Sequence, residues 1–387
     1  MVRSVVLLAA ACLLAGGCAS FPEEPPPTSW SAQPQLTPQA GPKPELPGEF
    51  RPTPGEQGRG QTPQSIPPPQ GCKDFSPAVI ATCLTTVTGV APIGADANGG
   101  VAAYATERGG RLVKVTKDVD PVVIAQIETD TSSDGGLTGL ALSATFAEDQ
   151  LAYVYVTTAT DNRVLRIAPG DTPKPILTGI PKGPSGNRGV LASDRRGSLL
   201  VATGDAGNPA LAADPNSLAG KVLRIDGSGK PAQGNPTAGS AVVSSGLRLP
   251  GGLCVSADAQ KIWVTDWTAA ADVVYRVAPG KLSEVAWNWP DKPGVMGCSS
   301  YSDMLTVTTS KTPGLQSLAM NATGAFTGKP ELTMQEDGFG RLGPMEMLND
   351  TASLVGTVNK AGGQPVSSDD RVAIVVREGG PGGGGKD

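Results

Sequence analysis

Short runs of alternating apolar residues, separated by polar turns, recur along most of the chain. Residues 151–156 show the pattern well, since Leu, Tyr and Tyr alternate there with Ala, Val and Val. A period of two predicts β-strands, because successive side chains of a strand point to opposite faces. We therefore expect an all-β protein.

These strands form a unit that repeats about every fifty residues. Each unit starts with a glycine-led strand and closes near Arg-Val or Arg-Ile. The clearest copies span residues 136–167, 189–225 and 251–277, and fainter ones span 297–334, 340–376 and a stretch before Asp130. Roughly fifty residues is the period of a four-stranded propeller blade. The sequence predicts a six-bladed β-propeller over residues 72–377; a pair of β-sandwiches is the alternative, which the shared closing motif disfavours.

The N-terminus carries an export signal. Arg3 precedes an apolar run at residues 5–15, and Gly16, Gly17 and Cys18 follow. The run is too short to span a bilayer, but it fits the core of a signal peptide. It resembles a bacterial lipoprotein signal, which implies that residues 1–17 are removed and that Cys18 is lipidated, for example with palmitate. An ordinary secretory signal is the alternative, because Ala15 stands where Leu or Val is usual.

The segment between this signal and the repeats, residues 18–71, is rich in proline. Fifteen prolines lie between Phe21 and Gln70. Such a composition predicts a disordered, extended tether, and a docking site for a proline-recognising domain is the weaker interpretation. The Gly-rich residues 378–387 are expected to be a disordered tail. They contain a GxxxxGK string, but Asp387 follows it where a phosphate-binding loop needs Ser or Thr.

Composition removes several function classes. The chain of 387 residues has no histidine, which excludes Ser-His-Asp and Cys-His catalysis and the commonest zinc ligand. A net charge of −5 gives no electrostatic reason to expect nucleic-acid binding. We expect the protein on the extracytoplasmic face of the cell membrane, held by its lipid anchor, with a carbohydrate or an envelope protein as partner.

The cysteines agree with export. Cys12 leaves with the signal and Cys18 carries the lipid, so Cys72, Cys83, Cys254 and Cys298 remain. Four cysteines allow three pairings. We favour Cys72 with Cys83, closing a small loop at the start of the domain, and Cys254 with Cys298, joining neighbouring blades. The absence of a CxxC spacing makes metal binding or redox exchange the poorer interpretation.

Several segments resemble a known family. They are TGDAGNPALAADPNSLAGKVLRI (203–225), DGGLTGLAL (134–142), DNRVLRI (161–167), GLRLPGGL (246–253), WNWPDKPG (287–294) and SSDDRVAIV (367–375). Together they resemble the soluble quinoprotein sugar dehydrogenases, the glucose and sorbosone dehydrogenase family. Residues 176–183 and 204–225 are also similar to a mycobacterial lipoprotein with the same signal, proline stalk and propeller.

The resemblance implies a six-bladed propeller that binds pyrroloquinoline quinone (PQQ) and calcium on one face and uses a histidine as the proton acceptor. The motif that this histidine opens reads Gly186-Asn187-Arg188-Gly189 here, so the base is absent. By resemblance, Asp205 matches the aspartate that orients the histidine, and Asp134 matches a catalytic-site Gln or Glu. The residues that match cofactor-binding positions are Arg248, Lys311, Arg341 and Asn187; Leu249 and Gly343 replace two further family residues.

Each retained residue also has a structural interpretation. Asp205 and Asn208 can shape a turn through hydrogen bonds to the backbone. Lys311 and Arg341 can be solvated charges, and Asp161 and Arg163 are expected to be structural. Arg248 is the better site residue, because it lies in a glycine-rich loop of a rigid scaffold.

Three functions remain open. The first is a quinone-dependent dehydrogenase with Asp205 or Asp134 as its base. The second is a propeller that kept the fold and lost the chemistry, and that now binds a sugar, a wall polymer or a protein. The third is a purely structural scaffold. Because a positioned general base contributes about 10²- to 10⁴-fold to a rate, the missing histidine favours the second.

Overall fold

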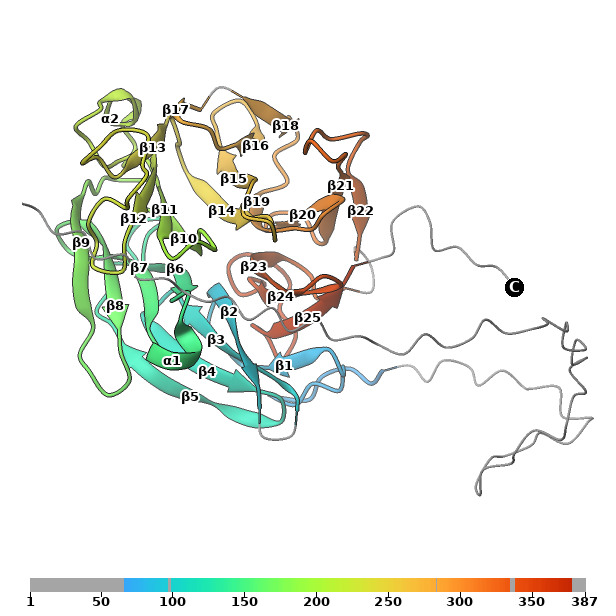
Figure 1. Ribbon diagram of the computed structural model, residues 1–387. Coiled ribbons are helices and arrows are strands. Elements are labelled where there is room, and N and C mark those ends of the chain that lie inside the picture. Colours follow the sequence, from blue (N-terminus) through green and yellow to red (C-terminus); the bar gives the residue numbers. More distant parts are fainter. Residues whose placement is uncertain (1–65, 97–98, 283, 335–337, 378–387) are drawn as a thin grey trace, which may run out of the picture. The chain divides into compact units, whose positions relative to one another are not determined.

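The computed structural model describes residues 66–377, apart from residues 97–98, 283 and 335–337 (Figure 1). The predicted signal peptide, Cys18, most of the Pro-rich segment and the Gly-rich tail lie outside the described residues. In the part of the chain that is described, no helix is long and apolar enough to cross a membrane. The only helices there are α1 (Phe146–Asp149) and α2 (Pro209–Ala213).

The strands form six sheets, which confirms the predicted six-bladed β-propeller (Figure 1). The first blade is β2 (Val87–Ala95), β3 (Val101–Glu107), β4 (Arg111–Thr116) and β5 (Val119–Gln126), and the second is β6 (Leu137–Leu142), β7 (Ala152–Thr157), β8 (Asn162–Ile167) and β9 (Lys174–Ile180). The third is β10 (Gly189–Ser193), β11 (Leu199–Thr203), β12 (Lys221–Ile225) and β13 (Val242–Ser245). A short strand, β17 (Gly280–Lys281), pairs with β13 at the edge of this third blade. The next two are β14 (Pro250–Val255), β15 (Ile262–Trp267), β16 (Asp272–Arg276) and β18 (Val285–Trp289); and β19 (Val295–Ser300), β20 (Met304–Thr309), β21 (Leu315–Ala319) and β22 (Glu331–Thr333).

The sixth blade is built from both ends of the propeller. Its strands β23 (Leu342–Asn349), β24 (Ala352–Thr357) and β25 (Val372–Val376) come from the end of the chain, whereas its outer strand β1 (Val79–Ala81) comes from the start. β1 pairs antiparallel with β25. The ring is therefore closed by backbone hydrogen bonds between segments almost three hundred residues apart, which the repeat pattern alone did not predict.

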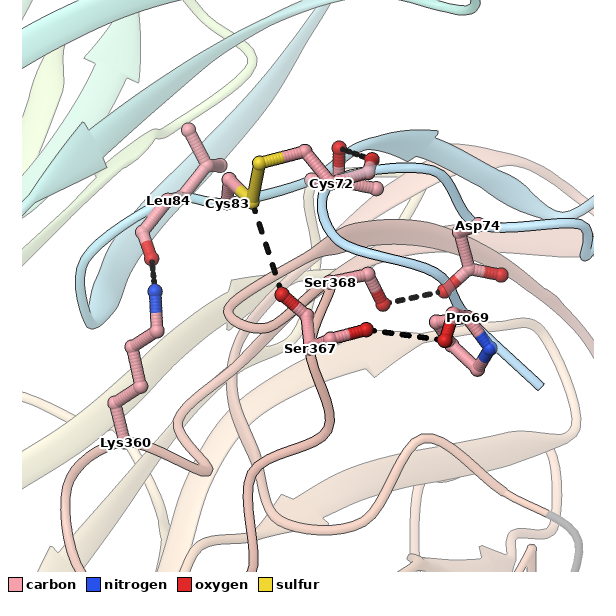
Figure 2. The surroundings of a disulfide bond; sticks show 9 residues. Pro69, Cys72, Asp74, Cys83, Leu84, Lys360, Ser367 and Ser368 are labelled. Atoms are coloured by element: carbon pink, nitrogen blue, oxygen red, sulfur yellow. Dashed lines mark hydrogen bonds between the residues drawn. A yellow bond between two sulfur atoms is a disulfide. The ribbon is translucent and has the colours of Figure 1, made fainter.

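The predicted disulfide Cys72–Cys83 lies beside this closure (Figure 2). The backbone N–H of Cys83 donates to the carbonyl of Ser368 at 2.8 Å, and the Ser368 hydroxyl donates to Asp74 at 2.8 Å. Lys360 donates to the carbonyl of Leu84 at 2.7 Å. The disulfide thus stiffens a short N-terminal loop that is hydrogen-bonded to the loops of the last blade.

Both faces of each blade are buried, because neighbouring blades pack face to face. In β7, Ala152, Val154 and Val156 belong to the apolar core shared with the first blade, whereas Tyr153 and Tyr155 belong to the core shared with the third. The alternation in residues 151–156 therefore separates two apolar cores rather than a core from solvent. Six such cores lie between successive blades.

The second predicted disulfide, Cys254–Cys298, is also present. It joins β14 to β19, the innermost strands of the fourth and fifth blades, and both cysteines are buried. It therefore links neighbouring blades across the wall of the central channel.

Candidate functional site

A cleft of about 240 Å³ lies where the loops enter the inner strands of the third, fourth and fifth blades. The loop before β10 contributes Gly186, the loop before β14 contributes Arg248, and residues just after β11, β15 and β20 contribute Asp205, Thr268 and Lys311. Trp267, Asp272 and Lys292 complete its charged and aromatic lining. The structure thus brings together Asp205, Arg248 and Lys311, three residues that the sequence singled out.

The backbone is closed around Gly186, the residue that the sequence resemblance matched to a histidine. Its φ is +68°, in the left-handed region that favours glycine. A Cβ atom built there would lie 2.5 Å from Oδ1 of Asp205 and 2.8 Å from the backbone nitrogen of Gly207. The loop has no room for a side chain at this position. Its conformation therefore requires glycine and excludes a proton-accepting side chain here.

Asp134 and Asn187 hold this loop in place. Asp134 accepts the backbone N–H groups of Gly186 and Asn187 at 3.0 and 3.2 Å. The amide of the fully buried Asn187 donates to Ser133 Oγ at 2.8 Å and to the carbonyl of Gly183 at 2.7 Å. Both side chains are therefore engaged by the protein itself, and neither lines the cleft.

Asp205 is the carboxylate that borders the cleft at Gly186. One of its oxygens accepts the backbone N–H of Gly207 at 2.8 Å. Burial raises the pKa of Asp205, and the nearby Arg248 opposes that shift. A buried carboxylate with a raised pKa can take up a proton more readily than a solvated one, so Asp205 is the better placed of the two predicted bases.

Asp266 sets the position of Arg248. This fully buried carboxylate accepts the backbone N–H groups of Arg248 at 3.0 Å and of Leu249 at 2.6 Å. Burial raises the pKa of Asp266 to about 6, against the lowering effect of those hydrogen bonds. The Arg248 side chain itself is exposed at the cleft.

Two cations lie on Trp267. The guanidinium carbon of Arg188 is 4.4 Å from the centre of its ring, and the Lys311 ammonium is 4.3 Å from it. Such contacts are attractive because the face of an indole carries negative potential. Trp267 therefore holds Lys311 at the cleft, whereas Arg188, on the same indole, does not line it. The indole N–H of Trp267 donates to the carbonyl of Val295 at 2.5 Å.

The guanidinium of Arg188 has hydrogen-bond donors that are not paired. Its Nη1 contacts the sulfur of Met296, but its Nε and Nη2 atoms are buried without a hydrogen-bond partner among the described residues. Burial lowers the pKa of Arg188 to about 10, so the guanidinium stays charged at neutral pH. Buried N–H donors are rarely left unpaired in proteins, so Arg188 is an exception that lies next to the cleft lining at Trp267.

The other singled-out residues have structural contacts. Arg341 does not line the cleft; its guanidinium lies beside the loop at Gly362 and Gly363. Asn208 caps α2 by accepting the N–H of Ala210 at 3.1 Å. Asp161 and Arg163 form an ion pair, in agreement with their predicted structural role.

Lys221 explains much of the long motif at residues 203–225. Its fully buried ammonium donates to the carbonyls of Leu211, Ala212 and Ala219 at 2.9, 2.8 and 2.8 Å. It thereby caps the carboxyl end of α2 and ties that helix to β12. The order of Gly, Asn and Lys in this motif is a folding signal for the loop that carries Asp205.

Sequence reasoning missed Arg188, Trp267 and Asp266 as site residues. Arg188 had a usable signal, because a bulky cation follows Gly186-Asn187 in a motif where the family has glycine. Trp267 and Asp266 follow no motif, and only the fold brings the end of β15 beside the loop before β10. Across the described ranges, no group of three or more Cys, Asp or Glu side chains is arranged to hold a metal ion.

The fold and the cleft define a class of protein: a six-bladed propeller with a ligand cleft, bordered by cations and a carboxylate, at one mouth of its channel. Residues 93–309 match the model of the Glucose / Sorbosone dehydrogenase family, which is more than half of the chain, and the chain belongs to that family. No curated protein sequence matches the chain.

Solved structures agree on the fold. The PQQ-bound form of an aldose sugar dehydrogenase from Streptomyces coelicolor is 24% identical, with a TM-score of 0.69 over 80% of this chain and 99% of that one. A putative oxidoreductase (glucose dehydrogenase) from Thermus thermophilus is 26% identical, with a TM-score of 0.68 over 77% and 98%. The soluble aldose sugar dehydrogenase from Escherichia coli is 18% identical, with a TM-score of 0.65 over 77% and 99%.

Proposed function

We propose that this protein is a cell-envelope lipoprotein whose propeller binds a carboxylate-bearing ligand in the cleft and has lost the dehydrogenase reaction of its family. The observation that carries the proposal is the backbone at Gly186, which leaves no room for a proton-accepting side chain where the family has histidine. Fold alone does not decide function, so the proposal rests on the cleft.

The donors of the cleft support a ligand with carboxylates. Arg248 and Lys311 are exposed there, and Lys292 is a third cation of the lining. Arginine and lysine are the residues that bind carboxylates most strongly, and binding is strengthened where water is excluded. The family cofactor PQQ is a planar tricarboxylate, and Arg248 and Lys311 would hold its carboxylates. When bound, such a quinone supplies a two-electron acceptor.

Calorimetric titration of the purified chain with PQQ, with and without calcium, tests ligand binding. We expect micromolar affinity, weakened about 10- to 100-fold by Lys311→Met, since a charged hydrogen bond contributes about 1.5 to 3 kcal/mol. Lys281→Met, at an exposed position away from the cleft, is the matched control and should leave the affinity unchanged. An unchanged affinity in Lys311→Met, or no binding at all, would remove PQQ as the ligand.

An active PQQ-dependent aldose dehydrogenase is the second candidate. The buried Asp205, whose pKa is raised, favours it as an alternative base. A dye-linked assay on aldoses with PQQ and calcium separates the two candidates. Turnover that is lost in Asp205→Asn would establish the enzyme, whereas binding without turnover supports the proposed loss of catalysis.

Lipidation of Cys18 and the Pro-rich tether complete the proposal. The signal-like residues 1–17 and the fifteen prolines that follow them are sequence features, similar to those of a mycobacterial lipoprotein. We expect an alkyne analogue of palmitate, fed to a bacterial host, to label the wild-type chain and not Cys18→Ser, and the membrane fraction to hold only the former. Equal labelling of both chains would contradict lipidation at this cysteine.

A further inference from the structure

A second cavity lies at the opposite end of the inner strands. It has a volume of about 350 Å³ and is lined by residues from the later parts of all six inner strands, β2, β6, β10, β14, β19 and β23. The cleft at Gly186 lies instead where the loops enter the inner strands. The two hollows are therefore separate, and the second one takes no part in the proposed function.

Two opposite charges line this cavity and do not pair. Glu346 is on β23, and Arg195 is on the turn after β10. Among the described residues, neither forms a salt bridge, although each is charged in ordinary surroundings. Arg195 is exposed, and its guanidinium lies 4.0 Å from the sulfur of Met347. Glu346 is half-buried, and its carboxylate accepts the backbone N–H of Met347.

Glu346 is held in surroundings that disfavour its charge. Burial raises its pKa to about 7, and the charge of Arg195 and the Met347 N–H offset this shift only in part. A half-buried carboxylate that lacks a paired cation is disfavoured as the charged form. A cationic group of a ligand, placed beside Glu346, would supply the charge that the protein does not.

A third polar group points to a ligand independently. Ser300, at the end of β19, is 1% exposed and its hydroxyl has no hydrogen-bond partner in the part of the chain that is described. Its neighbour Ser299, in contrast, accepts a hydrogen bond from Ser353 at 2.8 Å. Both serines line the same cavity as Glu346 and Arg195, so an unpaired hydroxyl belongs to a residue of its wall.

The rest of the wall is largely aliphatic. Leu140, Leu142, Leu253 and Val255 line the cavity between the charged groups. Apolar walls with a few fixed polar groups are typical of sites for small molecules.

We propose that this cavity binds a free amino acid with an aliphatic side chain, whose ammonium pairs with Glu346 and whose carboxylate pairs with Arg195. Unpaired charges of both signs favour a zwitterion over a neutral sugar, because a sugar would leave both charges unpaired. The leucine and valine side chains take up the hydrocarbon part of the ligand. The Ser300 hydroxyl is available to the same carboxylate or ammonium group.

Titration calorimetry with L-leucine and two partial analogues tests this proposal. 3-Methylbutylamine lacks the carboxylate, and 4-methylpentanoate lacks the ammonium. We expect L-leucine to bind, and each analogue to bind at least 10-fold more weakly, because each loses one ion pair. D-Glucose is included, and binding of glucose but not of leucine would overturn the proposal.

Variants of Glu346 and Arg195 test which residue binds the ammonium and which binds the carboxylate of the ligand. Glu346→Gln and Arg195→Met should each weaken L-leucine binding at least 10-fold, and Glu346→Gln should affect 4-methylpentanoate much less than 3-methylbutylamine. Arg196→Met is the matched control, because the Arg196 guanidinium donates to the carbonyl of Ala259 and does not line the cavity. Leucine affinity unchanged in Glu346→Gln and Arg195→Met would also contradict the site. The proposed PQQ site is the separate cleft at Gly186, so the affinity for PQQ should be the same in all three variants.

Discussion

Replacing Cys254 and Cys298 together by alanine lowers the free energy of unfolding by about 4 kcal/mol. The disulfide closes a segment with a sequence separation of 44, and it removes the corresponding chain entropy from the unfolded state. It also fixes β14 beside β19, where two blades meet at the channel. Urea denaturation of the oxidised wild type and of the double variant measures the difference.

The Cys72–Cys83 disulfide provides the comparison for this prediction. Its sequence separation is only 11, so the same entropic argument gives a smaller loss of about 3 kcal/mol for its double alanine variant. Equal losses, or a larger loss for Cys72–Cys83, would show that loop length does not govern the contribution of these bonds. Appearance of a separate transition at lower urea in that variant would instead identify the N-terminal closure as a unit that opens independently.

Gly186→His destabilises the protein by about 3 kcal/mol and does not restore a dehydrogenase. The new side chain would have to adopt a φ of +68°, which costs about 1 to 2 kcal/mol, and its Cβ would overlap with Asp205 and with the backbone of residues 206–207. The free energy of unfolding and the dye-linked activity on aldoses, with PQQ and calcium, are the two measurements.

Gly197→Ala is the matched control that separates steric overlap from backbone strain in the destabilisation expected for Gly186→His. Its φ is +94°, but a Cβ there would meet no atom within 4 Å. We expect this control to cost only the backbone strain, about 1 kcal/mol. A Gly186→His protein that is as stable as the control and oxidises sugars would show that the loop can reopen, and that loss of the histidine alone silenced the enzyme.

Much of the fold was predictable because it is local and repeated. The period-two strands, the unit of about fifty residues and the cysteine pairings predicted the six blades and both disulfides, and the structure confirms them. The closing strand β1 was not predictable in the same way. A three-residue strand has almost no sequence pattern, and its partner β25 lies at the other end of the chain.

The site was predictable only where a motif carried it. Asp205, Arg248 and Lys311 are brought to one cleft, as the resemblance implied. Arg341 matched the family pattern equally well, yet its side chain lies along the loop at residues 362–363. A matching residue type does not determine where a long, flexible side chain points, since its direction depends on the neighbours that the fold supplies.

The sequence by itself determined the strand pattern, the number of blades, the absence of histidine and the cysteines available for pairing, since each of these follows from residue type and spacing. Only the tertiary structure decided that Gly186 has no room for a side chain, that Arg188 and Lys311 share Trp267, and that Glu346 lines a cavity without forming a salt bridge. These properties depend on atoms from different blades, which the closed ring brings within a few ångströms of one another although they lie far apart in the chain.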